Sequence, residues 1–145
     1  MKSLVDYIKS QSVNESKMND SQFWKIMDKI KKENGGTNFE GAEETFTLLY
    51  NKVFNGNKEE AIAFGEAFFH KAATMQDKCE ADGYDDDIEY QSWDRVLRCK
   101  DEAEYKSVLK KRWFDGDEEN GENFAYGVPA SEADWKDNCD EFGLK

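Results

Sequence analysis

The chain has 145 residues, of which 38% are hydrophobic and 14% aromatic, and its formal net charge at pH 7 is −12. This length supports one domain with its own core, without disulfides or a structural metal. A chain this acidic has no basic face for nucleic-acid phosphates or an anionic membrane, which disfavours direct binding to either.

The composition favours helices and a reducing compartment. One proline and ten glycines point away from a loop-rich all-β fold, and frequent Lys, Glu and Ala point toward helices. Three widely spaced cysteines, Cys79, Cys99 and Cys139, form neither a disulfide framework nor a Cys-x-x-Cys metal pair. No apolar run approaches the ~20 residues of a membrane span, and charged residues interrupt the region where a secretory leader would lie. We expect a cytoplasmic protein.

Residues 1–19 have the pattern of an appendage. A short amphipathic turn or two is followed by a linker rich in Ser, Asn, Gln and Lys. A frayed N-terminal helix that docks weakly is the plain interpretation. We expect residues 20–145 to form a single helical domain. The apolar residues of the amphipathic part are Leu4, Val5, Tyr7 and Ile8.

The same segment supports a second interpretation. It begins Met-Lys-Ser-Leu-Val-Asp-Tyr-Ile, and residues 12–16 read Ser-Val-Asn-Glu-Ser. This pattern resembles the capsid-targeting leaders of internal head proteins in tailed bacteriophages, which run Met-Lys-x-x-x-(aromatic)-Ile and end in a Glu where a prohead protease cuts. The resemblance implies processing at Glu15 and a place in the virion interior.

The first two helices of the domain are expected before residue 57. One begins at Asp20 or Ser21 as its cap and stops at Asn34–Gly36. The next opens with Thr37 and Glu40 as a capping pair and ends at Asn55-Gly56. The first helix has one apolar face, formed by Phe23, Trp24, Met27 and Ile30.

The central helix is expected from Asn57 to about Cys79. Its apolar residues recur at three- and four-residue steps and cover roughly half the circumference, which predicts packing on two sides. Asn57 and Glu60 form a capping pair at its start. Four small residues would let neighbouring helices come close, namely Ala61, Gly65, Ala72 and Ala73.

Three further segments complete the predicted domain. Helices are expected from about Ile88 to Cys99 and, capped by Asp101, as far as Trp113. Residues 114–130 lose the helical period and predict a loop, with a short extended piece at 124–128. Ser131 caps a last short helix. The predicted fold is all-α, an irregular bundle of five or six helices with a long acidic loop before the last one.

Two segments resemble a family of small bacterial all-helical domains of unknown function. Residues 23–28 read Phe-Trp-x-x-Met-Asp, and residues 58–64 read Lys-Glu-Glu-Ala-Ile-x-Phe. That family opens with Phe-Trp-x-x-Ile and carries a Glu-Glu-Ile-x-x-Phe helix. The resemblance implies a helical fold and no activity.

The sequence offers little for catalysis or for a cofactor. His70 is the only histidine, so a nucleophile–base pair or a His-rich metal site has at most one member. Glu66 and Thr74 lie at helical spacing from it, although such a histidine is more often partly buried and structural. EF-hand loops counted from Asp82 or Asp115 lack Gly at the sixth position. We expect no metal, no cofactor and no enzyme activity.

Acidic residues with interleaved aromatics form the most unusual surface candidate. Exposed rings beside carboxylates suit an interface, because the rings bury area while the charges steer a basic partner. In the alternative, Trp113, Phe124 and Tyr126 fold back on the core and the acids are only solvated. The residues predicted to bind a partner are Asp85, Asp86, Asp87, Glu89, Trp113, Asp115, Asp117, Glu118, Glu119, Glu122 and Tyr126.

Three functions follow from these patterns. The first is a non-catalytic acidic interaction protein of the inhibitor, immunity or phage counter-defence type, which binds a basic protein such as a nucleic-acid-binding protein. The second is a phage internal protein that is packaged through its N-terminal leader. The third is a small enzyme that uses His70 or a carboxylate pair.

Overall fold

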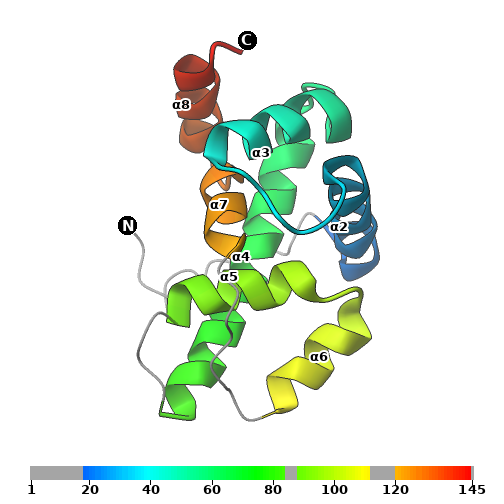
Figure 1. The fold of residues 1–145 in the computed structure, drawn as a ribbon, viewed down its shortest axis with the longest axis vertical. Coiled ribbons are helices and arrows are strands. Elements are labelled where there is room, and N and C mark those ends of the chain that lie inside the picture. The colour runs from blue at the N-terminus through cyan, green and yellow to red at the C-terminus, as the bar shows by residue number, and fades with distance from the viewer. Residues whose placement is uncertain (1–17, 84–87, 112–119, 145) are drawn as a thin grey trace.

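The computed structural model describes residues 18–83, 88–111 and 120–144, and every regular element in these ranges is helical (Figure 1). This confirms the all-α class. None of the helices in these ranges is long and apolar enough to cross a membrane. The elements are α2 (Asp20–Asn34), α3 (Ala42–Leu48), the π-helical turn η1 (Leu49–Val53), α4 (Lys58–Ala81), α5 (Ile88–Arg98), α6 (Glu102–Lys110), α7 (Asn120–Gly127) and α8 (Glu132–Phe142).

The central helix α4 begins where the sequence predicts. The side chain of Asn57 accepts a hydrogen bond from the backbone N–H of Glu60 at 3.1 Å, which satisfies one of the otherwise unpaired donors of the first turn. Eleven of the 24 residues of α4 are buried, so the predicted packing on two sides is confirmed. Figure 1 shows α5 crossing one half of α4, while α2, α3, α7 and α8 surround the other half.

Two predicted caps are wrong. α2 is capped by Asn19, not by Asp20 or Ser21, because Asn19 and Gln22 exchange side-chain and backbone hydrogen bonds of 2.8 and 3.2 Å. This reciprocal pair satisfies two backbone donors at once, more than a single cap can. Thr37 and Glu40 do not open α3, which begins at Ala42.

The later start of α3 follows from the burial of Phe39. Its ring lies 4.9 Å from that of Phe124 and is almost inaccessible to solvent, so the preceding segment is held in a non-helical conformation. Asn34 fixes the same segment by donating to the carbonyl oxygens of Gly36 and Asn38 at 2.9 and 3.1 Å. A buried aromatic outweighs a local capping signal here, because its burial removes much more apolar area from water.

The expected loop at 114–130 is wrong over its second half. Residues 120–127 form α7, and the predicted extended piece at 124–128 is therefore helical up to Gly127. α7 is therefore a helix that the sequence does not predict. The first part of the expected acidic loop, residues 114–119, lies outside the described residues, as do residues 112–113 and residues 1–17 with Glu15.

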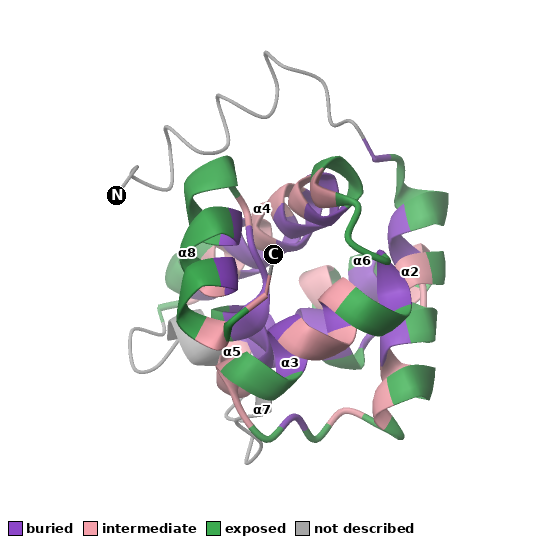
Figure 2. Ribbon diagram, turned by 90° about the horizontal axis from the view of Figure 1, so that it is seen from above, coloured by how far each residue is buried: buried purple, intermediate pink, exposed green. Residues whose placement is uncertain are grey.

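Glycine lets α7 pack closely on its neighbours, although its sequence looks like a loop. A Cβ at Gly121 would overlap the backbone nitrogen of Asp94, so only glycine lets α7 approach α5 this closely. The approach places Phe124 in the core, where its ring lies 5.1 Å from that of Phe68. Figure 2 shows buried residues facing the space between the helices and exposed ones facing outward on α2 and α8.

Gly65 in α4 is the position where side-chain size should matter most. A Cβ there would overlap the backbone carbonyl oxygen of Pro129. We predict that Gly65→Ala lowers the free energy of unfolding by about 2–4 kcal/mol, although a Gly-to-Ala change inside a helix ordinarily stabilises by about 1 kcal/mol. Urea denaturation followed by circular dichroism measures the change.

Gly41→Ala is the matched control. The backbone at Gly41 is extended, and an added Cβ meets only the end of the Glu44 side chain, at 3.1 Å. Its effect should stay within about 0.5 kcal/mol. A Gly65→Ala variant as stable as the parent chain would show that the contact with Pro129 relaxes at no cost.

Candidate functional site

Most of the residues predicted to bind a partner lie outside the described residues. Glu89 belongs to α5, but nothing is described of its side chain. Glu122 and Tyr126 are described, and both lie on α7, one turn apart and therefore on one face of that helix. The predicted residues outside the described ranges are Asp85, Asp86, Asp87, Trp113, Asp115, Asp117, Glu118 and Glu119.

Tyr126 is the large hydrophobic residue that the described chain leaves exposed, at 52%. Its ring lies 5.7 Å from that of Trp93 in an edge-to-face arrangement, and Trp93 lies 6.2 Å from Phe69 in the same manner. Tyr126 thus belongs to a row of rings that leads into the core. Phe124, two residues earlier, is fully buried. Phe124 therefore folds back on the core, whereas Tyr126 packs against Trp93 and stays 52% exposed.

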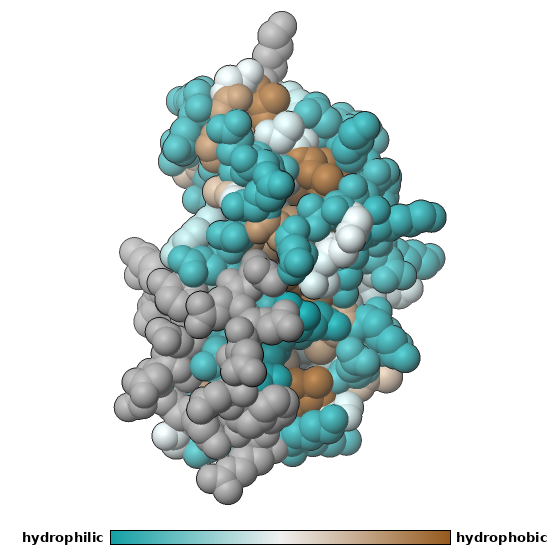
Figure 3. Space-filling model, in the orientation of Figure 1, coloured by the Kyte–Doolittle hydropathy of each residue, from teal (hydrophilic) through white to brown (hydrophobic). Residues whose placement is uncertain are grey.

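The position of α7 is fixed by polar contacts as well as by glycine. The side-chain amide of Asn123 donates to the carbonyl oxygen of Phe39 at 2.8 Å, and the hydroxyl of Thr45 donates to the carbonyl oxygen of Asn123 at 3.4 Å. These contacts attach α7, which carries Tyr126, to α3 and to the segment before α3. In the orientation of Figure 1, the described part of the surface is mostly hydrophilic, with small hydrophobic areas (Figure 3).

A second cluster surrounds Lys71, a lysine of α4 whose side chain is only 9% exposed. Its ammonium nitrogen lies 2.8 Å from Oε1 of Glu102 and 3.0 Å from Oδ1 of Asp20. The indole N–H of Trp24 donates to the same Oε1 of Glu102 at 2.8 Å. The cluster joins α2, α4 and α6.

Aromatic rings complete the surroundings of the Lys71 ammonium. The ring centroids of Phe23, Trp24 and Tyr105 lie 5.4, 5.7 and 4.8 Å from it. The hydroxyl of Tyr105 donates to the carbonyl oxygen of Lys71 at 2.9 Å, and burial raises the pKa of Tyr105 above its ordinary value. Ring faces attract cations, so this cage offsets part of the hydration that the ammonium loses.

This cluster is not among the predicted sites, although the sequence contains a signal for it. Lys71 lies three residues after Phe68 and four before Met75, inside the apolar stripe of α4. A charged residue in such a stripe is buried and must therefore be paired. The partners could not be named from the sequence, because Asp20 and Glu102 lie 51 and 31 residues away.

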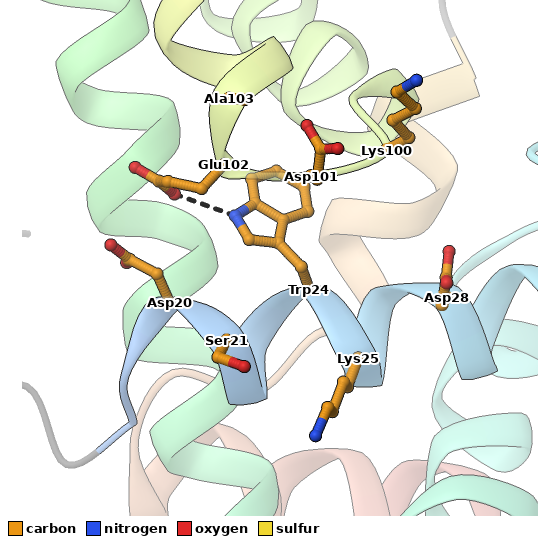
Figure 4. Close-up of a pocket in the computed structure, with 9 residues that line it drawn as sticks. All are labelled: Asp20, Ser21, Trp24, Lys25, Asp28, Lys100, Asp101, Glu102 and Ala103. Atoms are coloured by element: carbon orange, nitrogen blue, oxygen red, sulfur yellow. Dashed lines mark hydrogen bonds between the residues drawn. The ribbon is translucent and has the colours of Figure 1, made fainter.

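A recess of about 520 Å³ lies beside the cluster, between α2 and α6 (Figure 4). The indole of Trp24 stands at its centre, with carboxylates from both helices around it. The lining residues are Asp20, Ser21, Trp24, Lys25, Asp28, Lys100, Asp101, Glu102 and Ala103.

His70 is half-buried beside Lys71. Burial and then the charge of Lys71 lower the pKa of His70, while Asp20 opposes the shift. The hydroxyl of Thr74 donates to the backbone oxygen of His70 at 3.1 Å and does not orient the imidazole by that bond. His70 lines neither the recess between α2 and α6 nor the one between α2 and the start of α4.

The three cysteines are buried thiols. Burial raises the pKa of Cys99 to about 12 and also raises that of Cys139. Because the thiolate is the reactive form, these two side chains are poor nucleophiles at neutral pH. Among the described residues, no group of three or more His, Cys, Asp or Glu side chains is arranged to hold a metal ion.

No family model, no curated protein and no solved structure matches this chain. The resemblances to phage leaders and to small bacterial helical domains therefore stay predictions.

The ionic cluster should contribute measurably to stability. We predict that Lys71→Met lowers the free energy of unfolding by about 1–3 kcal/mol, because it leaves Glu102 in a mostly buried place without its cation. The double variant Lys71→Met with Glu102→Gln should lose less free energy of unfolding than the sum of the two single variants' losses. The reason is that the same interaction is removed only once. A urea-denaturation double-mutant cycle measures this coupling.

Lys58→Met serves as the control for the Lys71 cycle. Lys58 pairs with Glu132 at 2.7 Å, but both side chains are exposed, at 43% and 76%. Its loss should leave the free energy of unfolding almost unchanged, because solvent screens an exposed pair. Strictly additive effects of the Lys71 and Glu102 changes would contradict the predicted coupling.

The lowered pKa of His70 predicts a pH effect. The folded chain binds the imidazole proton less readily than the unfolded chain, whose ordinary pKa is 6.5. The free energy of unfolding should therefore be unaffected above that pH and fall as the pH drops below it. NMR titration of the single histidine should give a midpoint below 6.5. His70→Gln should remove the pH dependence of the free energy of unfolding that His70 causes. A titration midpoint above 6.5 would contradict the prediction.

Proposed function

We propose that this protein is a non-catalytic acidic interaction protein of the cytoplasm that binds a basic protein partner through α7. The observation that carries the proposal is Tyr126, a half-exposed ring of α7 that packs against Trp93. Tyrosine in this setting buries a large area at a low entropic cost and adds a hydroxyl, which is why it is frequent among the dominant residues of interfaces.

The charge of the chain supports a basic partner. The net charge is −12, and Glu122 lies one turn from Tyr126 on the same face of α7. Long-range attraction between an acidic protein and a basic one accelerates their encounter and selects against acidic competitors. A basic protein that normally binds nucleic acid fits this chemistry, and an inhibitor, an immunity protein or a phage counter-defence factor would act in this way.

The test uses a photo-crosslinking amino acid at position 126, in a bacterial lysate at low and at high salt. The same amino acid at Lys136, an exposed position of α8, is the control. We expect position 126 to capture one basic protein at low salt, with capture weakened at high salt because screening shortens the range of the attraction. Position 136 should not capture it.

Substitutions then test the residues themselves on the captured partner. Tyr126→Ala should weaken binding by about tenfold or more, as expected for a dominant interface residue, while Tyr126→Phe keeps the ring and should retain most of the affinity. Glu122→Gln should mainly slow association. Binding that survives Tyr126→Ala unchanged, or capture of an acidic protein, would refute the proposal.

A further inference from the structure

We propose that α6 opens as a unit while the rest of the chain stays folded, and that Glu102 is the residue that holds it closed. Three observations support this local opening, and none of them involves α7. Few residues of α6 are buried, its hydrogen bonds with other helices meet at one carboxylate and its ion-pair partner, and the helices beneath it are joined without it.

α6 is held by few buried residues. Tyr105 is the one residue of α6 that is buried, whereas each of the other described helices buries at least two. Val108 and Leu109 are only partly buried against the core. Figure 1 shows α6 at the side of the molecule, and among the described helices it packs mainly against α2. A helix with few buried apolar contacts opens at a lower free energy than a helix of the core.

Two hydrogen bonds from other helices end on one oxygen of α6, Oε1 of Glu102. They come from the ammonium of Lys71 in α4 and from the indole N–H of Trp24 in α2, each at 2.8 Å. Tyr105, one turn further along α6, donates to the carbonyl oxygen of Lys71 at 2.9 Å. The attachment of α6 therefore depends strongly on Glu102 and on the residue with which it pairs.

Glu102 holds α6 through its charge. The side chains of Glu102 and Lys71 are 23% and 9% exposed, so both charges have lost much of their hydration in the closed state. Removing one charge of such a pair leaves the other poorly compensated. Without the charge of Glu102, the ammonium of Lys71 would pair with Asp20, whose side chain is 58% exposed, and would regain water as α6 moves away. Loss of this one charge therefore favours the open state.

α2 and α4 stay joined without α6. Phe23 of α2 and Phe64 of α4 stack with their ring centroids 5.2 Å apart, in a contact that α6 does not share. Trp24 is 6% exposed in the closed state, and its ring centroid lies 6.1 Å from that of Tyr105. Opening of α6 therefore exposes the Trp24 indole and the Lys71 ammonium together, on two helices that remain folded.

Hydrogen exchange of the full chain, followed by NMR for each amide, tests the local opening. The protection of an amide reports the free energy of the opening that exposes it. We expect the amides of α6 to share one protection factor, at least about tenfold below that in the middle of α4. The indole N–H of Trp24, assigned with Trp24→Phe among the four tryptophans, should exchange through the same opening.

Two variants separate the opening of α6 from unfolding of the whole chain. Glu102→Gln removes the charge and keeps the size of the side chain. It should lower the protection of α6 and of the middle of α4 alike, by about fivefold or more, because it destabilises the closed state alone.

Trp135→Phe is the matched control, because it reduces a buried side chain of α8, at the opposite end of the molecule from α6 (Figure 1). It weakens the closed and the open state equally. It should therefore lower the protection in the middle of α4 by a similar factor and leave that of α6 unchanged. Circular dichroism shows whether each variant is folded.

The comparison within the parent chain needs no variant. Equal protection in α6 and in the middle of α4 would overturn the proposal, since α6 would then open only with the whole fold. Protection that falls gradually along α6 would show fraying from one end instead of opening as a unit. Unchanged protection of α6 in Glu102→Gln, or a loss in Trp135→Phe as large as that in α4, would equally overturn it.

Discussion

The fold depends on one helix, α4, that has to be buried on both sides. Its small residues allow this, and Gly65 lies so close to the backbone of Pro129 that no side chain would fit between them. Gly121 likewise lets α7 approach the backbone of Asp94 in α5. Close backbone approach around α4 brings the rings of Phe64, Phe68 and Phe124 together, and this aromatic contact compensates for a modest hydrophobic content.

The burial of α4 also explains its single buried cation. A helix that packs on two sides has to bury whatever polar residue falls in its apolar stripe, and Lys71 is that residue. Its ammonium forms ion pairs with Asp20 and Glu102, from two other helices, and contacts the faces of three aromatic rings. A buried ion pair of this kind gives little net stability compared with apolar packing, and here it joins α2 and α6 to α4. The cluster therefore links α2 and α6 to α4 at a defined position.

Much of the fold could be predicted from the sequence, because its signals are local. The apolar period of α4, the cap at Asn57 and the cap at Ser131, whose hydroxyl accepts from the N–H of Asp134 at 3.1 Å, each depend on neighbouring residues. α7 could not be predicted, since the advantage of its glycine lies in a contact with α5 that no local pattern contains. The same holds for the recess at Trp24. The sequence indicates Tyr126 as a ring beside acidic residues. It does not indicate that Tyr126 is exposed while Phe124 is buried, because that difference depends on how α7 packs.

The buried thiols give the molecule a property of use in spectroscopy. Native cysteines that are inaccessible, with the pKa of Cys99 raised to about 12, react slowly with maleimides and iodoacetamides at neutral pH. A cysteine introduced on the surface would therefore take up a fluorophore or a spin label selectively, without first replacing the native ones. Distances between α7 and α6 could then be followed in solution in a chain whose interior is unchanged.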